Sequence, residues 1–99
     1  MANVLPQDVE AYVAHTFGIG ERPDARTLLE GAVLHDGSAP APRLLRCAAV
    51  ASGGSLERLR MEVETLKRDY RDVIVEGEYE PRDGKLVRLR DLNDPIPLP

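Results

Sequence analysis

The run of residues 44–56 decides the fold, and its sequence is LLRCAAVASGGSL. Its first part, residues 44–51, is short, almost entirely apolar and bounded by Pro42 and Gly53. Such a run is typical of a β-strand that is buried on both faces. We therefore expect a strand over residues 44–51, followed by a glycine-containing turn.

The spacing of apolar residues changes directly after this turn. They now recur three and four positions apart, and most of the residues between them are charged. This spacing is typical of an amphipathic helix that buries one narrow stripe. It predicts a helix over residues 56–70 with Ser55 as its N-cap. The stripe is Leu56, Leu59, Val63, Leu66 and Tyr70.

Two further strands are predicted after this helix. The β-branched residues 73–75 begin a segment that continues to Tyr79, and residues 85–90 return after the turn Pro81-Arg82-Asp83-Gly84. One arm of this hairpin is acidic and the other is basic, so opposite charges would attract across the strands. The charged residues are Glu76, Glu78 and Glu80 on one arm, and Lys85, Arg88 and Arg90 on the other.

The N-terminal third is predicted to be helical. Pro6 and the apolar spacing after it indicate a helix over residues 6–17. Residues 25–35 are open to two interpretations, a second helix or a strand over residues 28–35. The prolines within residues 36–42 indicate an irregular linker, and the three prolines within residues 94–99 indicate a frayed tail.

Together these elements predict the α+β class. The expected fold is a small mixed three-stranded sheet, made of a βαβ unit plus a C-terminal hairpin, packed with two N-terminal helices in the order α-α-β-α-β-β. Ninety-nine residues suffice for a single domain, which we expect to span residues 1–99. The order of the three strands in the sheet is left open.

Composition and charge narrow the classes of function. The formal net charge of −4 and the low aromatic content, 4%, argue against nucleic-acid binding. The chain has one cysteine, Cys47, and neither a signal peptide nor an apolar stretch long enough to cross a membrane is found in the sequence. These observations predict a cytoplasmic protein that makes no membrane contact.

The candidate site is the glycine junction Ser52-Gly53-Gly54-Ser55. A strand that passes through glycines into a helix can bind an anion, because free N–H groups and the helix dipole point at it. Arg71 or Arg43 would be the neighbouring cation. The third glycine of a dinucleotide fingerprint and the lysine of a P-loop are both missing, so a simple chain-reversing turn is the competing interpretation.

Other residues that could bind a metal or take part in catalysis are better explained by structural roles. His15 and His35 have no further ligands at metal-binding spacing, and Cys47 lies in the apolar run, where it would behave as a small buried hydrophobe. The polar cluster of residues 68–72 is explained by ion pairs near a helix end. No catalytic residue, metal or cofactor is therefore predicted.

The sequence favours a small interaction or accessory protein without catalytic activity. Its narrow apolar stripes would leave a face for a protein partner or for a second copy in a homodimer. The alternative is a small-ligand or phosphate-binding domain, possibly enzymatic, that uses the junction of residues 52–55.

Overall fold

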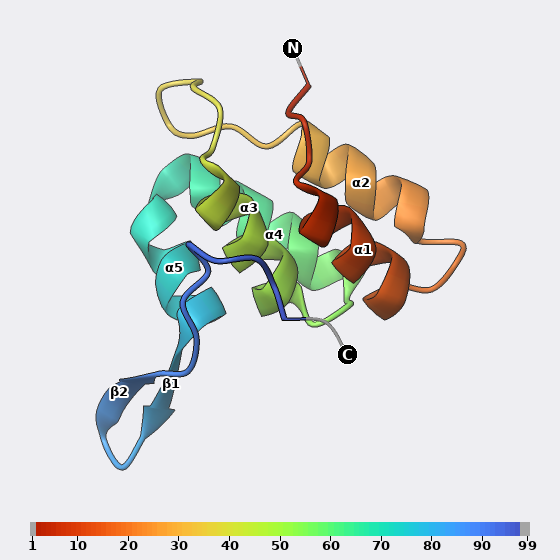
Figure 1. Ribbon diagram of the computed structural model, residues 1–99. Helices are drawn as coiled ribbons and strands as arrows, with labels where there is room; N and C mark the ends of the chain where they lie inside the picture. The colour runs from red at the N-terminus through yellow and green to blue at the C-terminus, as the bar shows by residue number, and fades with distance from the viewer. Residues whose placement is uncertain (1, 98–99) are drawn as a thin grey trace.

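The computed structural model describes residues 2–97, which contain five helices and one two-stranded antiparallel sheet (Figure 1). The elements are α1 (Gln7–Thr16), α2 (Arg22–Glu30), α3 (Pro42–Ser52), α4 (Leu56–Arg68), α5 (Tyr70–Glu78), β1 (Tyr79–Arg82) and β2 (Lys85–Arg88). The two strands form a hairpin that points away from the helices (Figure 1).

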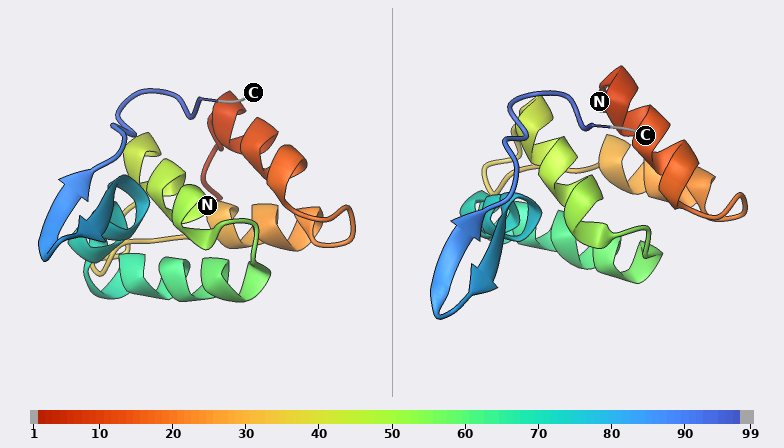
Figure 2. Two further views of the ribbon diagram at one scale, coloured as in Figure 1. Left: turned by 90° about the horizontal axis from the view of Figure 1, so that it is seen from below. Right: turned by 60° about the horizontal axis from the view of Figure 1, so that its bottom comes forward.

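Helix α3 lies at the centre of the helical body. It contacts α1, α4 and α5, while α2 packs on α1 and α4 (Figure 2). The core lies between these helices, and neither strand contributes to it. Its largest fully buried apolar side chains are Phe17, Leu29, Leu45, Leu59, Leu66 and Leu92.

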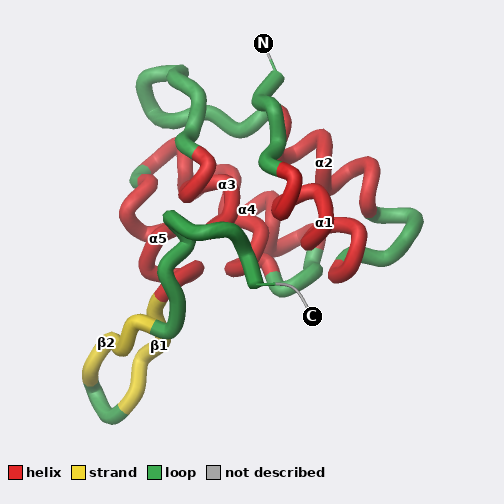
Figure 3. The backbone as a smooth tube through the Cα atoms, in the orientation of Figure 1, coloured by secondary structure: helices red, strands yellow, loops and turns green. Residues whose placement is uncertain are grey.

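The predicted three-stranded mixed sheet is wrong. Residues 44–51 lie inside α3 and residues 73–78 inside α5, and within residues 2–97 only the hairpin is extended into paired strands (Figure 3). The βαβ unit is therefore replaced by three consecutive helices. A short apolar sequence fits both a buried strand and a helix that is buried on nearly all sides, because it shows no periodicity. Here it forms a helix.

Both ends of α3 carry helix signals. Pro42 occupies the first turn, where its missing N–H costs nothing, and Gly53 ends the helix with a φ of 60°. After the exposed Pro42, the residues up to Ser52 are buried except for Arg43, Arg46 and Val50, which are partly exposed. These positions are three and four residues apart, so they lie on one face of a helix.

Helix α5 forms although it contains three consecutive β-branched residues, 73–75. Asp69 caps its N-terminus, because its carboxylate accepts a hydrogen bond from the backbone N–H of Arg71. Val73 is buried in the core. Tertiary packing therefore outweighs the strand preference of this segment.

Several expected elements are confirmed. The helix predicted over residues 6–17 is α1, and the helical interpretation of residues 25–35 is correct for residues up to Glu30. The helix predicted over residues 56–70 is α4, which ends at Arg68. Within its stripe Leu59 and Leu66 are buried, whereas Tyr70 belongs to α5 and is exposed.

The C-terminal hairpin is also confirmed, with a shorter first arm than expected. Its turn is centred on Asp83 and Gly84, and Pro81 lies within β1 rather than in the turn. Of the expected charge pairs across the arms, Arg88 and Glu78 do meet. Glu80 instead pairs with Arg82 on its own strand.

The tail after β2 returns across α3 towards α1 (Figure 1). Ile96 is buried in the core, and its backbone N–H donates to the carboxylate of Asp8 at 3.0 Å. The sequence predicts a frayed tail over residues 94–99, but Ile96 packs on the core while residues 94, 95 and 97 are exposed; residues 98–99 lie outside the described part of the chain. In the expected linker, residues 38–41 are irregular and Pro42 already belongs to α3.

Candidate functional site

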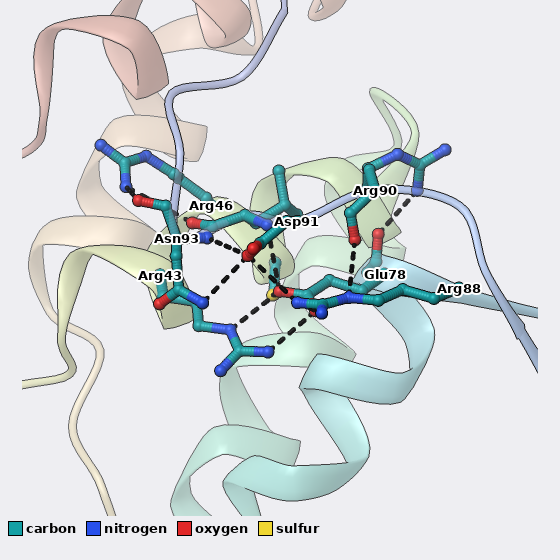
Figure 4. A network of polar contacts seen from close by, with 10 residues as sticks. Arg43, Arg46, Glu78, Arg88, Arg90, Asp91 and Asn93 are labelled. Carbon is teal, nitrogen blue, oxygen red and sulfur yellow. Dashed lines mark hydrogen bonds and ion pairs between the residues drawn. The ribbon is translucent and has the colours of Figure 1, made fainter.

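Glu78, the last residue of α5, is the centre of a network of polar contacts (Figure 4). Its carboxylate is fully buried and accepts two hydrogen bonds from the guanidinium of Arg43, both at 2.8 Å. Arg88 donates a further hydrogen bond at 2.9 Å, and the backbone N–H of Leu92 another at 3.1 Å. Helix α3, helix α5, strand β2 and the tail are therefore joined at one carboxylate, which we call the Glu78 network.

The electrostatics of this network argue against a catalytic role for its members. The bidentate contact with Arg43 outweighs the effect of burial and lowers the pKa of Glu78 to about 2. Burial, together with the charge of Glu78, raises the pKa of the Cys47 thiol to about 12. Glu78 is therefore an anion and Cys47 a buried neutral thiol at neutral pH, and neither is poised to exchange a proton or act as a nucleophile.

A second set of contacts fixes the tail. Arg46 of α3 forms an ion pair with Asp8 of α1 at 2.9 Å and donates to the carbonyl of Asn93 at 3.2 Å. Burial raises the pKa of Asp8, but the hydrogen bonds from Arg46 and Ile96 exceed this effect and lower it. Like the Glu78 network, these contacts bind the base of the hairpin and its tail to the helical body.

The hairpin has a defined pattern of backbone hydrogen bonds. Asp83 and Gly84 have φ values of 51° and 74°, as a two-residue type I′ turn requires. Arg82 and Lys85 therefore form the first hydrogen-bonded pair, and the bonding alternates from there along the register. The N–H of Leu89 donates to the carbonyl of Glu78 at 2.7 Å, in agreement with this alternation.

This alternation directs the backbone groups of Leu86 and Arg88 away from β1. The backbone hydrogen bonds that residues 2–97 make outside helices and strands include none from either residue. On the other edge, Pro81 has the matching outward position and has no N–H to donate. The β2 edge, defined here as the outward backbone groups of Leu86 and Arg88, is therefore the better of the two for pairing.

The side chains around the β2 edge are apolar and basic. All four residues of β2 are exposed, and Leu86 keeps 59% of its surface accessible. Residues 85–90 read KLVRLR, with three basic residues and no acidic one, in a chain whose net charge is −4. A basic strand thus projects from an otherwise acidic protein.

The junction of residues 52–55, expected to lie between a strand and a helix, connects two helices instead. The hydroxyl of Ser52 donates to the carbonyl of Ala49 at 2.6 Å, and that of Ser55 accepts from the N–H of Arg58 at 3.3 Å. Gly53 and Gly54 both have positive φ, and a Cβ on Gly54 would lie 2.7 Å from the carbonyl oxygen of Thr16. The turn geometry and the close contact with α1 both require glycine here.

The proposed cations are not gathered at this junction. Arg43 lies in the first turn of α3 while Ser52 ends the helix, about 13.5 Å away at 1.5 Å of rise per residue. Its guanidinium is bound to Glu78. Arg71 lies beyond the far end of α4 and pairs with Asp69 at 3.0 Å.

A pair of carboxyl groups lies where α4 and α5 face each other. Glu62 is only 5% exposed and lines a cleft of about 290 Å³ together with Glu76. Its Oε1 atom has no hydrogen-bond partner among the described residues. Burial, together with the neighbouring Glu76, raises the pKa of Glu62 to about 8.

Sequence reasoning missed two of these features, the Arg43 contact with Glu78 and the buried position of Glu62. Both depend on which helix faces meet in the fold. For Glu62, however, the sequence spacing gave a partial indication. It lies three residues after Leu59 and four before Leu66, on the stripe that α4 buries.

A pocket of about 530 Å³ lies between α1 and α2. Glu10 and Arg26 form an ion pair at its side, at 2.8 Å. Within residues 2–97, no three His, Cys, Asp or Glu side chains are grouped so that they could hold a metal ion. None of the helices in the same residues has the length and apolar character needed to cross a bilayer.

Comparison of the chain with protein-family models, with curated proteins and with solved structures gives no match. Among the described residues, the hairpin β1–β2 projects from the helical body and exposes all four residues of β2 (Figure 1).

Proposed function

We propose that this chain is a small interaction protein without catalytic activity, and that the hairpin β1–β2 is its contact element. The observation that carries the proposal is the exposure of all four β2 residues on a ribbon that leaves the helical body (Figure 1). An isolated two-stranded ribbon is only marginally stable in water, and an exposed strand edge is open to pairing. Contact with another protein would cover both Leu86 and the edge.

The anchoring of the hairpin supports this role. Arg88 and the residues that follow it are tied to Glu78, so the base of the ribbon is held while its tip remains exposed. An element presented in this way loses little conformational freedom when it binds, and this loss is a main cost of association. The ionised Glu78 and the neutral Cys47 support the non-catalytic part of the proposal.

The expected partner is a different protein rather than a second copy. Pairing two β2 edges would bring two KLVRLR segments together, and each is basic throughout its polar positions. Like charges on neighbouring strands are destabilising. We place this interaction in the cytoplasm, because a free cysteine such as Cys47 suits a reducing compartment.

Site-specific photocrosslinking tests the proposal in the cells that naturally produce the protein. A photoreactive residue replaces Leu86 in one variant and Met61, on α4, in the control, since the two side chains are almost equally exposed at 59% and 61%. We expect a discrete adduct with another protein from position 86 and none from position 61. The protein in the adduct is then purified, and its affinity for the unmodified chain is measured by calorimetry.

Two outcomes would contradict the proposed function. One is the same diffuse labelling from both positions, and the other is an adduct with a second copy of this chain. A purified candidate that fails to bind, or that binds a variant with the hairpin replaced by a short glycine linker equally well, would also exclude the hairpin as the contact element.

A further inference from the structure

We propose, building on the proposed function, that the β2 edge binds an extended acidic segment of the partner, which adds to the hairpin as a third strand. The backbone groups of Leu86 and Arg88 would provide the hydrogen bonds, and the basic side chains around them would select the charge of the segment. The partner is thereby defined by two properties, an extended backbone and carboxylate side chains.

The register of the hairpin leaves backbone donors and acceptors on the β2 edge. Leu86 and Arg88 each direct an N–H donor and a carbonyl acceptor away from β1, because Lys85 and Val87 use theirs within the ladder. An added strand would satisfy these groups in the same way as any strand that joins a sheet edge. On the opposite edge Pro81 has no backbone N–H to donate, so the segment is expected on β2 alone.

The charged side chains around this edge are basic. Residues 85–90 carry Lys85, Arg88 and Arg90, and no acidic side chain interrupts them. Arg88 is bound to Glu78 and Asp91, whereas the described contacts of Lys85 include no ion pair. Carboxylates on the added strand would pair with Lys85 in the first place, since Arg88 already has two carboxylate partners and Arg90 donates to the carbonyl of Gly77. A basic segment would be repelled by the same side chains.

A nucleic acid is a less suitable occupant of the same strand. β2 has no aromatic side chain on which a base could stack, and outward N–H and C=O groups in alternation match a peptide backbone rather than a row of phosphates. RNA is therefore included in the experiment as a competing outcome.

The test uses the full chain, labelled with ¹⁵N, and a seven-residue probe peptide with the sequence Thr-Glu-Val-Glu-Val-Glu-Thr. One control peptide has lysine in place of every glutamate, and a second has proline in place of both valines. The proline peptide keeps the charge but cannot form a strand. An eight-residue oligouridine is the fourth probe.

We expect saturable shifts with the acidic peptide alone. Hydrogen exchange should slow at the amides of Leu86 and Arg88 and remain unchanged at those of Lys85 and Val87, which are already bonded to β1. Lys85→Glu should weaken the binding about threefold or more. Arg60→Glu, which makes the same charge change on the exposed face of α4, should leave it unchanged.

Several results would overturn the inference. They are the absence of saturable shifts, shifts centred outside the hairpin, equal binding of the lysine or proline peptide, and the same response to oligouridine. If the crosslink from position 86 still forms in any of these cases, the hairpin remains the contact element and only the acidic strand is excluded. If the crosslink is absent as well, the proposed function fails too.

Discussion

A Cβ atom added to Gly77 of α5 would lie 2.7 Å from the Cα atom of Cys47 in α3. The two helices therefore approach backbone to backbone at this pair, where only glycine leaves enough room. The next residue along α5 is Glu78, whose carboxylate reaches Arg43 on the same α3. The close contact of Gly77 with Cys47 thus brings Glu78 within reach of Arg43, in the network that anchors the hairpin.

Gly77→Ala is expected to lower the free energy of unfolding by about 1–3 kcal/mol, because an added methyl group forces the packed helices apart. Urea denaturation followed by circular dichroism measures the loss. Gly20→Ala is the matched control, since a Cβ there meets no atom within 4 Å, and it should change stability by less than about 0.5 kcal/mol. A Gly77→Ala protein as stable as the control would refute the close contact.

Glu78→Gln should destabilise the fold by about 1.5–3 kcal/mol, because a neutral amide replaces the buried carboxylate that accepts charged hydrogen bonds from the partly exposed guanidiniums of Arg43 and Arg88. Glu80→Gln removes a carboxylate from an exposed pair with Arg82 and should cost less than about 1 kcal/mol. Chemical denaturation at neutral pH measures the stability loss of each variant. Equal small losses in both variants would show that the Glu78 network does not hold the hairpin base.

The same network predicts an acid dependence. The folded pKa of Glu78, about 2, lies below its ordinary value of 4.5, so its contribution to stability is present above pH 4.5 and is lost as the pH falls towards 2. Glu78→Gln cannot titrate at this position and should therefore lose stability less steeply than the wild type over this range. Denaturation curves recorded from pH 5 down to pH 2 measure the two slopes, and equal slopes would contradict the lowered pKa.

The helices at residues 7–16 and 56–68 could be predicted because their apolar residues repeat at helical spacing beside charged ones. The segment of α3 could not, because an eight-residue apolar run has no polar face wide enough to reveal its period. The sequence held only weak helix signals there, the three-residue spacing of Arg43 and Arg46 and the alanines of the run, and these did not outweigh its apolar character. The misassigned strand then led to a sheet that does not exist.

The second error, at α5, has a different cause. Residues 73–75 prefer strands locally, and the contact between Gly77 and Cys47 that favours a helix joins segments thirty residues apart. No local pattern contains that information. The candidate site at residues 52–55 depended on the misassigned strand, whereas the hairpin, whose turn residues Asp83 and Gly84 carry their own conformational preference, could be predicted from the sequence.

Phosphate is expected to leave the amide resonances of residues 52–56 unchanged. The hydroxyls of Ser52 and Ser55 are already engaged within the turn, and the N–H of Gly53 donates to the carbonyl of Val50. Titration with sodium phosphate is compared with sodium chloride at the same ionic strength. Saturable shifts confined to these residues in phosphate alone would establish an anion site there, since free N–H groups at a helix start are what such a site uses.

The raised pKa of Glu62 predicts that the protein loses stability as the pH rises from about 4.5 to about 8. Burial, together with Glu76, raises its folded pKa from 4.5 to about 8, so the folded state holds the proton more tightly than the unfolded state. The stability that this proton contributes is fully present below pH 4.5. It is lost as the pH rises to about 8, by at most about 1.4 kcal/mol for each pH unit between the two pKa values.

Glu62→Gln keeps the size and neutrality of the protonated side chain. It should therefore be more stable than the wild type at pH 9, by at least about 1 kcal/mol, and nearly equal to it at pH 4. Glu64→Gln, on the exposed face of the same helix, should follow the wild type at both values. Denaturation curves of Glu62→Gln that parallel the wild type from pH 4 to pH 9 would mean that Glu62 titrates as an ordinary solvated carboxyl group.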